Sequence, residues 1–428
     1  MPSFFSYALG CRVNQAEKIA IDNQLLKMGF QFSKTNPDLF ILNTCTVTHK
    51  ADRESRQLIY QAKKDFPQAK IIVTGCAATY WLKEKLDKKM KIDLIVDNQS
   101  KDLIVRRILN LLKINQTLSL DRQMFVDKYL SSKRVIIKIQ DGCHRFCSFC
   151  IVPYLRGLPQ SLPPSVVVDK ITQYQKEFAI KETILTAINT EAYGRDINKS
   201  LVELLTVVFK QTTVERISFG SIHPWSIDKE FLNFYQKVNS LGRLVNFFHI
   251  PLQSGSNRIL RLMKRGYERE EFEEKLEAIQ KIEKKALLAT DVIVGFLDES
   301  EKEFNETLEF LERSPLRRFH VFRYSPRKGT AAYFLGKRLK VVDEKTKTKR
   351  AEILRKLSAR KYHQFLQSLV GGKDQVLVLD KKIDNESYEG LLSNQIPIIV
   401  QVKANDVGQI KPIKIEVCKK GKLFGKII

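Results

Sequence analysis

Three cysteines lie within eight residues of the segment DGCHRFCSFC, at Cys143, Cys147 and Cys150. A structural zinc site closes with four protein ligands, whereas a site that performs chemistry keeps one position open. No fourth cysteine follows at a matching interval. The spacing therefore fits zinc completed by His144 or a distant histidine. It also fits three corners of a cubane iron–sulfur cluster whose fourth iron has no protein ligand.

Three further cysteines follow apolar runs in the first third of the chain: SFFSYALG, DLFILNT and AKIIVTG precede Cys11, Cys45 and Cys76. Such runs predict strands, and the stretches between them have helical patterns. Strand–helix–strand order predicts a parallel sheet, whose functional crevice lies at the carboxyl ends of the strands. We expect the three thiols to converge there. Three buried, inert thiols are the alternative. A fourth repeat carries Asp97 and Asn98 at the equivalent position.

Composition bounds the class of protein. With 428 residues, the chain is too long for one ordinary core. Its net charge of +25 favours a polyanionic partner such as nucleic acid, although charged solvated surfaces are an alternative. The start of the chain lacks the layout of a signal peptide, so its cysteines predict metal binding in a reducing compartment rather than disulfides. No apolar run approaches the ~20 residues of a membrane span. We expect a cytoplasmic protein with no membrane partner.

The remaining patterns predict an α/β chain with several domains. A polar stretch at about 115–133 is expected to be a linker. From RVIIKIQ onward, repeated strand–helix alternation predicts a full or partial (β/α) barrel, in which the loops after the strands hold the chemistry. A basic helix follows. The last part of the chain alternates apolar and polar residues between turn signals, which predicts a small β-barrel that binds nucleic acid or merely caps the core.

The chain resembles a known family over nearly its whole length. The CxxxCxxC spacing with Phe149 before the last cysteine resembles the signature of the radical S-adenosylmethionine (SAM) superfamily. The segments RVIIKIQDGCHRFCSFCIVPYLRG, HIPLQSGSNRILRLMKRGY, TDVIVGF and HVFRYSPRKGTAA are similar to the radical domain of the methylthiotransferases. The resemblance implies an N-terminal parallel-sheet α/β domain at 1–115, a radical SAM partial (β/α) barrel at 130–360, and an RNA-binding β-barrel of the TRAM type at 368–428.

The resemblance also implies roles for the six cysteines. Cys143, Cys147 and Cys150 would be catalytic, binding the [4Fe–4S] cluster that cleaves SAM to a 5′-deoxyadenosyl radical. A second [4Fe–4S] cluster that carries or delivers sulfur would be bound by Cys11, Cys45 and Cys76. One SAM would methylate the sulfur, and the radical from another would remove hydrogen from C2 of an adenine. That C–H bond offers no acid or base handle, so the cofactors must supply the difficult step.

Within the family, ALGCRVNQAE, AINTEAYGRD and SIHPW most resemble the subgroup that acts on N6-threonylcarbamoyladenosine at position 37 of tRNA. This implies three partners: the tRNA anticodon loop at adenosine 37, an electron donor such as flavodoxin or ferredoxin, and an unidentified sulfur donor. The alternatives are the subgroups that act on isopentenyladenosine in tRNA or on a ribosomal protein, a catalytically degenerate RNA-binding relative, and a zinc-stabilised RNA-binding protein.

Five residues are predicted to contact SAM. They are Phe149, beside the last cysteine, and Thr186, Asn189, Gln253 and Ser254, which follow expected barrel strands. Exclusion of water by Phe149 and ordinary loop capping by the others are the alternatives.

Four other residues have smaller expected roles. Asn14 and Gln15 follow the first cysteine and would hydrogen-bond cluster sulfur or cap a helix. Cys418 is expected to be a small buried hydrophobic residue. His320 is expected to be packed or hydrogen-bonded in a strand.

Some loops depart from the family pattern. Ala187 stands where relatives read close to LTG, and Leu297 and Asp298 stand where they read close to GFPGE. His223 replaces a usual glutamate before proline, and Leu162 a common arginine. Glycine permits backbone angles that other residues restrict, so these changes could weaken cofactor binding. They support the degenerate alternative, whereas retention of all six cysteines supports the enzyme.

Overall fold

The computed structural model describes residues 1–114 and 129–428, which divide into two compact units. The N-terminal unit comprises residues 1–114, 141–159 and 325–333. The core unit comprises residues 129–140, 160–324 and 334–428. Most of the linker expected at about 115–133 lies outside the described residues. The boundaries 1–115, 130–360 and 368–428 stay predictions.

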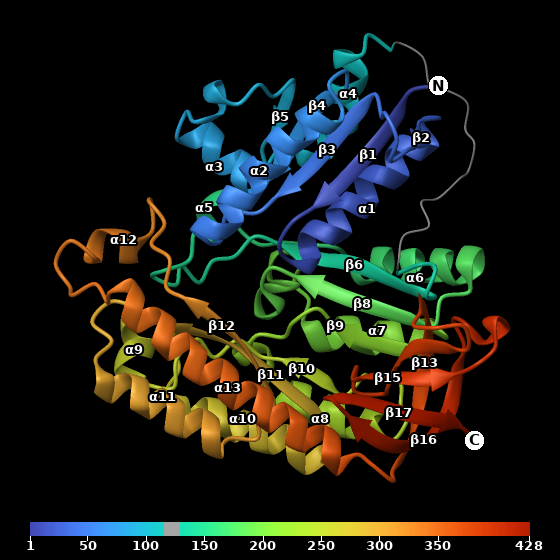
Figure 1. Cartoon of the computed structure of the whole chain (residues 1–428), viewed down its shortest axis with the longest axis vertical. Helices are drawn as coiled ribbons and strands as arrows, with labels where there is room; N and C mark the ends of the chain where they lie inside the picture. The colour runs from blue at the N-terminus through green and yellow to red at the C-terminus, as the bar shows by residue number, and fades with distance from the viewer. Residues whose placement is uncertain (115–128) are drawn as a thin grey trace. The chain divides into compact units, whose positions relative to one another are not determined.

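The N-terminal unit is a parallel sheet in the order β2-β1-β3-β4-β5 (Figure 1). Its strands are β1 (Ser3–Ala8), β2 (Gln31–Phe32), β3 (Leu39–Thr44), β4 (Lys70–Gly75) and β5 (Leu94–Val96). Its helices include α1 (Arg12–Lys27), α2 (His49–Asp65), α3 (Cys76–Lys83), α4 (Ile104–Leu111) and α5 (Val152–Arg156). Short 3-10 turns occur at η1 (Asp87–Lys89) and η2 (Lys101–Leu103).

Both faces of this sheet are buried, as expected for parallel strands with crossover helices. One face packs against α1 and α4 through residues such as Phe4, Leu25 and Ile108. The other packs against α2 and α3 through residues such as Ile59 and Trp81. The carboxyl ends of the strands are therefore held in fixed register.

The core unit contains two groups of strands. One group has the order β7-β6-β8-β9, and the other has the order β10-β11-β12. Their bounds are β6 (Arg134–Asp141), β7 (Gln160–Ser161), β8 (Glu182–Ala187), β9 (Arg216–Phe219), β10 (Phe247–His249), β11 (Leu287–Val294) and β12 (Arg318–Arg323). A parallel bridge from Ile217 to Leu244 and a hydrogen bond from Ile222 N to His249 O (3.0 Å) join β9 to the β10 side. The strands form the partial barrel that the alternating pattern predicts.

Helices follow these strands in chain order: α6 (Pro164–Phe178), α7 (Leu201–Gln211), α8 (Lys229–Asn239), α9 (Asn257–Leu262), α10 (Arg269–Ile282), α11 (Glu301–Arg313), α12 (Ala331–Leu335) and α13 (Glu344–Ser368). The 3-10 turns are η3 (Thr190–Ala192), η4 (Arg195–Ile197) and η5 (Pro224–Ser226). Figure 1 shows α13 alongside β12, and Ser358 Oγ accepts from Phe319 N at 2.8 Å. Among the described residues, no helix has the length and apolar character needed to cross a membrane.

The C-terminal part of the core unit is a closed barrel in the order β13-β14-β15-β17-β16. Its strands are β13 (Lys373–Lys382), β14 (Ser387–Leu391), β15 (Pro397–Gln401), β16 (Ile410–Lys419) and β17 (Lys422–Ile427), with η6 (Ala404–Asp406) between β15 and β16. Closure leaves no unpaired sheet edge. Val376, Val400, Ile413 and Leu423 fill its interior. The predicted α/β class with parallel sheets and a small β-barrel is confirmed.

A buried ionic network joins this barrel to the amino ends of the core strands. Arg134 pairs with Glu182 at 2.9 Å, and Gln395 donates to Glu182 Oε1 at 2.8 Å. Arg216 donates to the carbonyl oxygens of Leu391 (2.8 Å) and Gln375 (2.7 Å). Burial opposes ionisation of Glu182, but the nearby arginines lower its pKa. The strand ends opposite those used for chemistry are thus closed by structural contacts.

Candidate active site

The N-terminal cysteines lie at the carboxyl ends of three neighbouring strands. Cys11 precedes α1, Cys45 directly follows β3, and Cys76 begins α3 after β4. Gly10 has a φ of +85°, and a β-carbon there would lie 2.7 Å from Cys45 Sγ. The sheet therefore brings together three thiols that are far apart in the sequence.

The surroundings of these thiols oppose free thiolates. Burial, together with the charges of Cys76 and Cys11, raises the pKa of Cys45 to about 12. Burial also raises the pKa of Cys11, although the residue as a whole is exposed. Three adjacent thiolates need nearby positive charge, which a coordinated metal centre supplies. None of the seven cysteines forms a disulfide, so this donor set fits an iron–sulfur cluster.

A buried arginine reaches this site from the second cysteine loop. Arg156, the last residue of α5, donates through Nε to Cys76 Sγ at 3.3 Å and through Nη2 to Asn14 Oδ1 at 2.7 Å. Its Nη1 contacts Glu17 Oε1 at 2.9 Å and Asp141 Oδ1 at 2.8 Å. Only 1% of its side chain is exposed. Because a buried charge is costly unless paired, these partners fix the guanidinium beside Cys76.

Amide side chains complete the surroundings of the N-terminal cysteines. Asn14 Nδ2 donates to the carbonyl oxygens of Leu9 (2.7 Å) and Thr44 (2.9 Å), so it ties two cysteine-bearing strand ends together. Asn98 Nδ2 donates a hydrogen bond to Cys76 Sγ at 3.7 Å.

A second cation and a backbone contact lie close by. Lys101 Nζ pairs with Glu17 Oε2 at 2.5 Å, and both groups are buried. Gln15 N donates to Cys11 O at 3.3 Å within the first turn of α1.

The second cysteine set lies on one loop after β6. Cys147 is buried, whereas Cys143 and Cys150 are half-buried. Cys143 N donates to Gly157 O at 3.0 Å, which closes the loop, and Cys150 N donates to Cys147 O at 2.9 Å. Gly142 has a φ of +73°, and a β-carbon there would overlap a carbonyl oxygen at 2.1 Å. Phe149, also half-buried, sits on this loop.

Two further contacts hold this loop within the N-terminal unit. Ile151 and Leu155 pack with Cys76 in one buried cluster. Residues 325–333 contact the middle of the loop, where Ala332 N donates to Ser148 O at 2.7 Å.

The 325–333 segment carries a second buried arginine. The guanidinium of Arg327 lies 4.7 Å from the ring centroid of Tyr80 and 3.7 Å from Asp52 Oδ1. Neither Arg156 nor Arg327 was predicted from the sequence. The only signal was their position in the motifs VPYLRG and YSPRKGT, which does not show what they contact.

The other predicted SAM residues belong to the core unit. Thr186 is buried near the end of β8. Asn189 N donates to Gln140 Oε1 at 3.0 Å, and Asn189 Oδ1 accepts from Glu191 N at 3.2 Å. Asn189 thus caps its own loop, as the alternative had suggested.

Gln253 and Ser254 lie in the loop after β10. Gln253 has a φ of +79°, and its N donates to Asp291 O at 2.9 Å. The hydroxyl of Ser254 lies 3.3 Å from that of Thr307. Contacts of these residues with SAM stay predictions.

The loops that depart from the family pattern have ordered contacts. His223 Nδ1 accepts from Thr190 N at 3.3 Å, and Leu162 O accepts from the Tyr193 hydroxyl at 2.7 Å. Asp298, with a φ of +60°, pairs with Arg258 at 2.7 Å.

Ala187 and Leu297 are buried. Cys418 is half-buried in β16, where it packs against the barrel core.

Two family models match the chain. The model of the radical SAM superfamily matches residues 137–311, and that of the uncharacterized protein family UPF0004 matches residues 3–97. Among solved structures, the radical S-adenosylmethionine methyltransferase TsrM from Kitasatospora setae, with tryptophan and a SAM analogue bound, aligns with a TM-score of 0.55 at 12% identity. That alignment covers 75% of this chain and 73% of TsrM, and it shows a shared fold. Fold and site together define a radical SAM protein.

Relatives narrow the class. Threonylcarbamoyladenosine tRNA methylthiotransferase MtaB of Aquifex aeolicus is 37% identical over 393 residues, which cover 89% of this chain and 94% of the relative. The tRNA-2-methylthio-N(6)-dimethylallyladenosine synthase of Pelagibacter ubique is 30% identical and covers 100% of this chain and 98% of that relative. The chain therefore belongs to the radical SAM methylthiotransferase family. It is an enzyme of the transferase class, and its family implies one [4Fe–4S] cluster and SAM.

Proposed function

We propose that this enzyme converts N6-threonylcarbamoyladenosine at position 37 of tRNA into its 2-methylthio derivative. The observation that carries the proposal is the presence of two three-cysteine sets in one compact unit, linked by Arg156. The Aquifex aeolicus relative that is named for this nucleoside is 37% identical to the chain. The relative named for the isopentenyl (dimethylallyl) nucleoside is 30% identical, so the comparison favours threonylcarbamoyladenosine as the substrate.

In this proposal, each cysteine set holds one [4Fe–4S] cluster. Cys143, Cys147 and Cys150 hold the cluster that binds SAM, and Cys11, Cys45 and Cys76 hold the second. When bound, these groups supply a 5′-deoxyadenosyl radical able to remove hydrogen from an unactivated aromatic carbon, together with sulfur for insertion. Phe149, Thr186, Asn189, Gln253 and Ser254 are the proposed contacts for SAM.

The chain's own residues prepare the second site. Burial raises the pKa of Cys11, but the positive charge of Arg156 opposes this effect, and Arg156 also donates to Cys76 Sγ. Glu17 pairs with both Arg156 and Lys101, and Asn14 holds two strand ends. These residues act as positioning groups, since they fix the thiols and their charge before a cluster binds.

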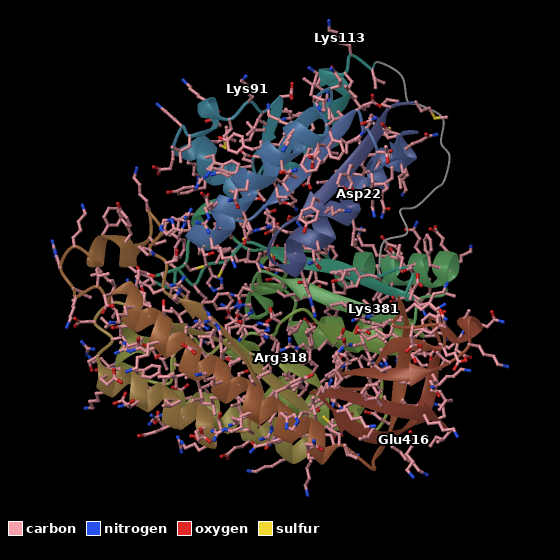
Figure 2. All side chains as sticks on the ribbon, viewed as in Figure 1. Asp22, Lys91, Lys113, Arg318, Lys381 and Glu416 are labelled. Carbon is pink, nitrogen blue, oxygen red and sulfur yellow. The ribbon has the colours of Figure 1, made fainter. Side chains whose placement is uncertain are left out.

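The core unit offers a basic surface for RNA. A cavity of about 540 Å³ lies between β12, α13 and the closed barrel. Its lining includes Arg318 (labelled in Figure 2), Arg355, Tyr362 and Lys422. Such side chains meet phosphates through charge and position RNA without reading its sequence.

A second hollow, of about 760 Å³, shares Lys422 with the first and adds Lys419, Lys420 and Lys426. Acidic Glu416, labelled in Figure 2, also lines it, so the surface is predominantly but not wholly basic. The two hollows make the barrel side of the core unit the proposed surface for the anticodon arm.

The test uses protein reconstituted anaerobically with iron and sulfide. The proposal predicts about eight irons per chain, 5′-deoxyadenosine from SAM under reduction, and a 2-methylthio product on tRNA carrying threonylcarbamoyladenosine. Nucleosides released from the tRNA are measured by mass spectrometry, with tRNA carrying isopentenyladenosine in parallel. Methylthiolation of the isopentenyl substrate alone would overturn the nucleoside assignment. Zinc in place of iron would overturn the cluster assignment.

A further inference from the structure

Two histidines and an aspartate converge on three neighbouring strands of the core unit. His249 Nε2 lies 3.0 Å from Asp291 Oδ1, and His320 Nδ1 lies 3.4 Å from the same oxygen. All three ligand atoms lie within 4.8 Å of one another. None of these residues belongs to the six-cysteine sites or to the predicted SAM contacts.

The strand register explains the convergence. Asp291 of β11 is directly opposite His320 of β12, and His249 of β10 is opposite Ala289, two residues before Asp291. Residues paired across parallel strands point to the same side of the sheet, and so do residues two apart in one strand. All three side chains therefore share one face. Helix-facing residues such as Val292 and Phe319 occupy the other.

The separations of the three ligand atoms are those of hydrogen-bonded groups, and they also fit two ligands of one metal ion. Zinc binds imidazole nitrogen and carboxylate oxygen at 2.0–2.2 Å, so two ligands of a tetrahedral site lie about 3.3 Å apart. The observed nitrogen–oxygen distances of 3.0 and 3.4 Å bracket this value. The imidazole centroids are 4.9 Å apart, close to the about 5 Å that two histidines on one zinc ion imply.

Burial and charge suit a ligand site that opens to solvent. His249 is buried, whereas about half of the His320 side chain is exposed to solvent. The Asp291 carboxylate oxygen lies between the two imidazole nitrogens, within hydrogen-bonding distance of each.

We propose that His249, Asp291 and His320 bind one divalent transition-metal ion, with zinc as the reference ion. Two imidazoles and one carboxylate are a donor set that binds zinc with an open fourth position. His320 also lines the 540 Å³ cavity, so one of the three proposed ligands borders a space that a small molecule can enter. An oxygen donor, such as a carboxylate, is the chemical class of ligand that the open position would take.

Binding of the substrate's own carboxylate at the open metal position rests on the proposed function. The threonylcarbamoyl group carries a carboxylate, and the isopentenyl group does not. Metal binding itself does not rest on the proposed function. Metal content tests the metal site, and methylthiolation tests the proposed function. Both are measured on the same samples, so that failure of one can be told from failure of the other.

The test is zinc binding by the reconstituted full-length protein, whose six cysteines are then occupied by iron–sulfur clusters. We expect one zinc per chain by equilibrium dialysis. Absorption at the zinc K-edge should report nitrogen and oxygen neighbours at about 2.0–2.1 Å without sulfur. Because iron and zinc absorb at different edges, the clusters do not contribute to this signal.

Variants assign the site. His320→Phe and Asp291→Asn should each weaken zinc binding at least tenfold, since even loss of an outer-shell partner costs about 10–100-fold. His363→Phe, which changes an exposed histidine of α13, is the matched control and should bind zinc normally. Iron content and thermal unfolding verify that each variant is folded. Sulfur ligation of zinc, or equal affinity in the two site variants and the control, would overturn the metal assignment and leave a hydrogen-bonded trio.

Discussion

The two cysteine sets of the N-terminal unit are built in different ways. Cys11, Cys45 and Cys76 come from three strand ends and meet only when the sheet has formed. Cys143, Cys147 and Cys150 lie on one short loop that a backbone hydrogen bond closes. The first site is consequently as stable as the sheet, whereas the second is local and stands to gain order from its own metal centre. Variants that disturb long-range packing should therefore affect the first site selectively.

The largest expected effect separates the two sites by chemistry. Cys147→Ala should abolish formation of 5′-deoxyadenosine and lower the iron content from about eight to about four per chain. Cys76→Ala should lose the same amount of iron but still cleave SAM, while methylthiolation stops. Iron analysis and mass spectrometry of both products are the measurements. Unchanged iron in Cys76→Ala would contradict the existence of a second cluster.

Arg156 is the next largest test, because it joins the loop to the strand-end site. Arg156→Met leaves the buried Glu17 carboxylate and the half-buried Asp141 carboxylate with one cation fewer. Breaking a buried ion pair from one side costs about 3–5 kcal/mol, so the free energy of unfolding in urea should fall by that order. Near-native stability of this variant would show that the network is not structural.

The matched control is an exposed ion pair. Arg360 pairs with Glu312, and more than half of each side chain is exposed. Arg360→Met should change the free energy of unfolding by less than about 1 kcal/mol. A redox titration of the reconstituted Arg156→Lys variant gives a second readout. We expect the reduction potential of the cluster at Cys11, Cys45 and Cys76 to shift, while that of the loop cluster stays unchanged. The lysine keeps the positive charge but loses the directed donor to Cys76 Sγ.

A smaller effect is expected where Gly10 approaches Cys45. Gly10→Ala places a β-carbon 2.7 Å from Cys45 Sγ at a φ of +85°. Gly242→Ala has a comparable φ of +64° but no neighbouring atom within 4 Å. The control should lose about 1 kcal/mol from backbone strain alone. Gly10→Ala should lose more and should bind less iron at the strand-end site. Equal iron content in both variants would show that the strand-end site tolerates displacement of Cys45.

The two sites also differ in how far the sequence predicts them. The CxxxCxxC loop is local, so its spacing alone indicates a metal site, either zinc completed by a histidine or an open iron–sulfur cluster. The strand-end cysteines could be predicted because each apolar run ends in the same way and parallel strands share one edge. The Arg156 contacts with Glu17 and Cys76 could not, because no periodic pattern encodes a long-range ion pair. The sequence also did not predict the cluster of His249, Asp291 and His320. These residues come together only through the register of three strands that are distant in the sequence.

The smallest expected effect lies in the core unit, at Lys422, which lines both hollows. If these hollows hold RNA phosphates, Lys422→Gln should weaken tRNA binding by about 1 kcal/mol, or about fivefold. It should also reduce the slope of log affinity against log salt by about 0.7–0.9, since one phosphate contact is lost. Lys373→Gln, at an exposed lysine outside both hollows, should leave affinity and slope unchanged. Because Lys422 belongs to neither cysteine set, its variant should still form 5′-deoxyadenosine at the normal rate. A loss of SAM cleavage in that variant would mean that RNA binding and radical formation are not separable.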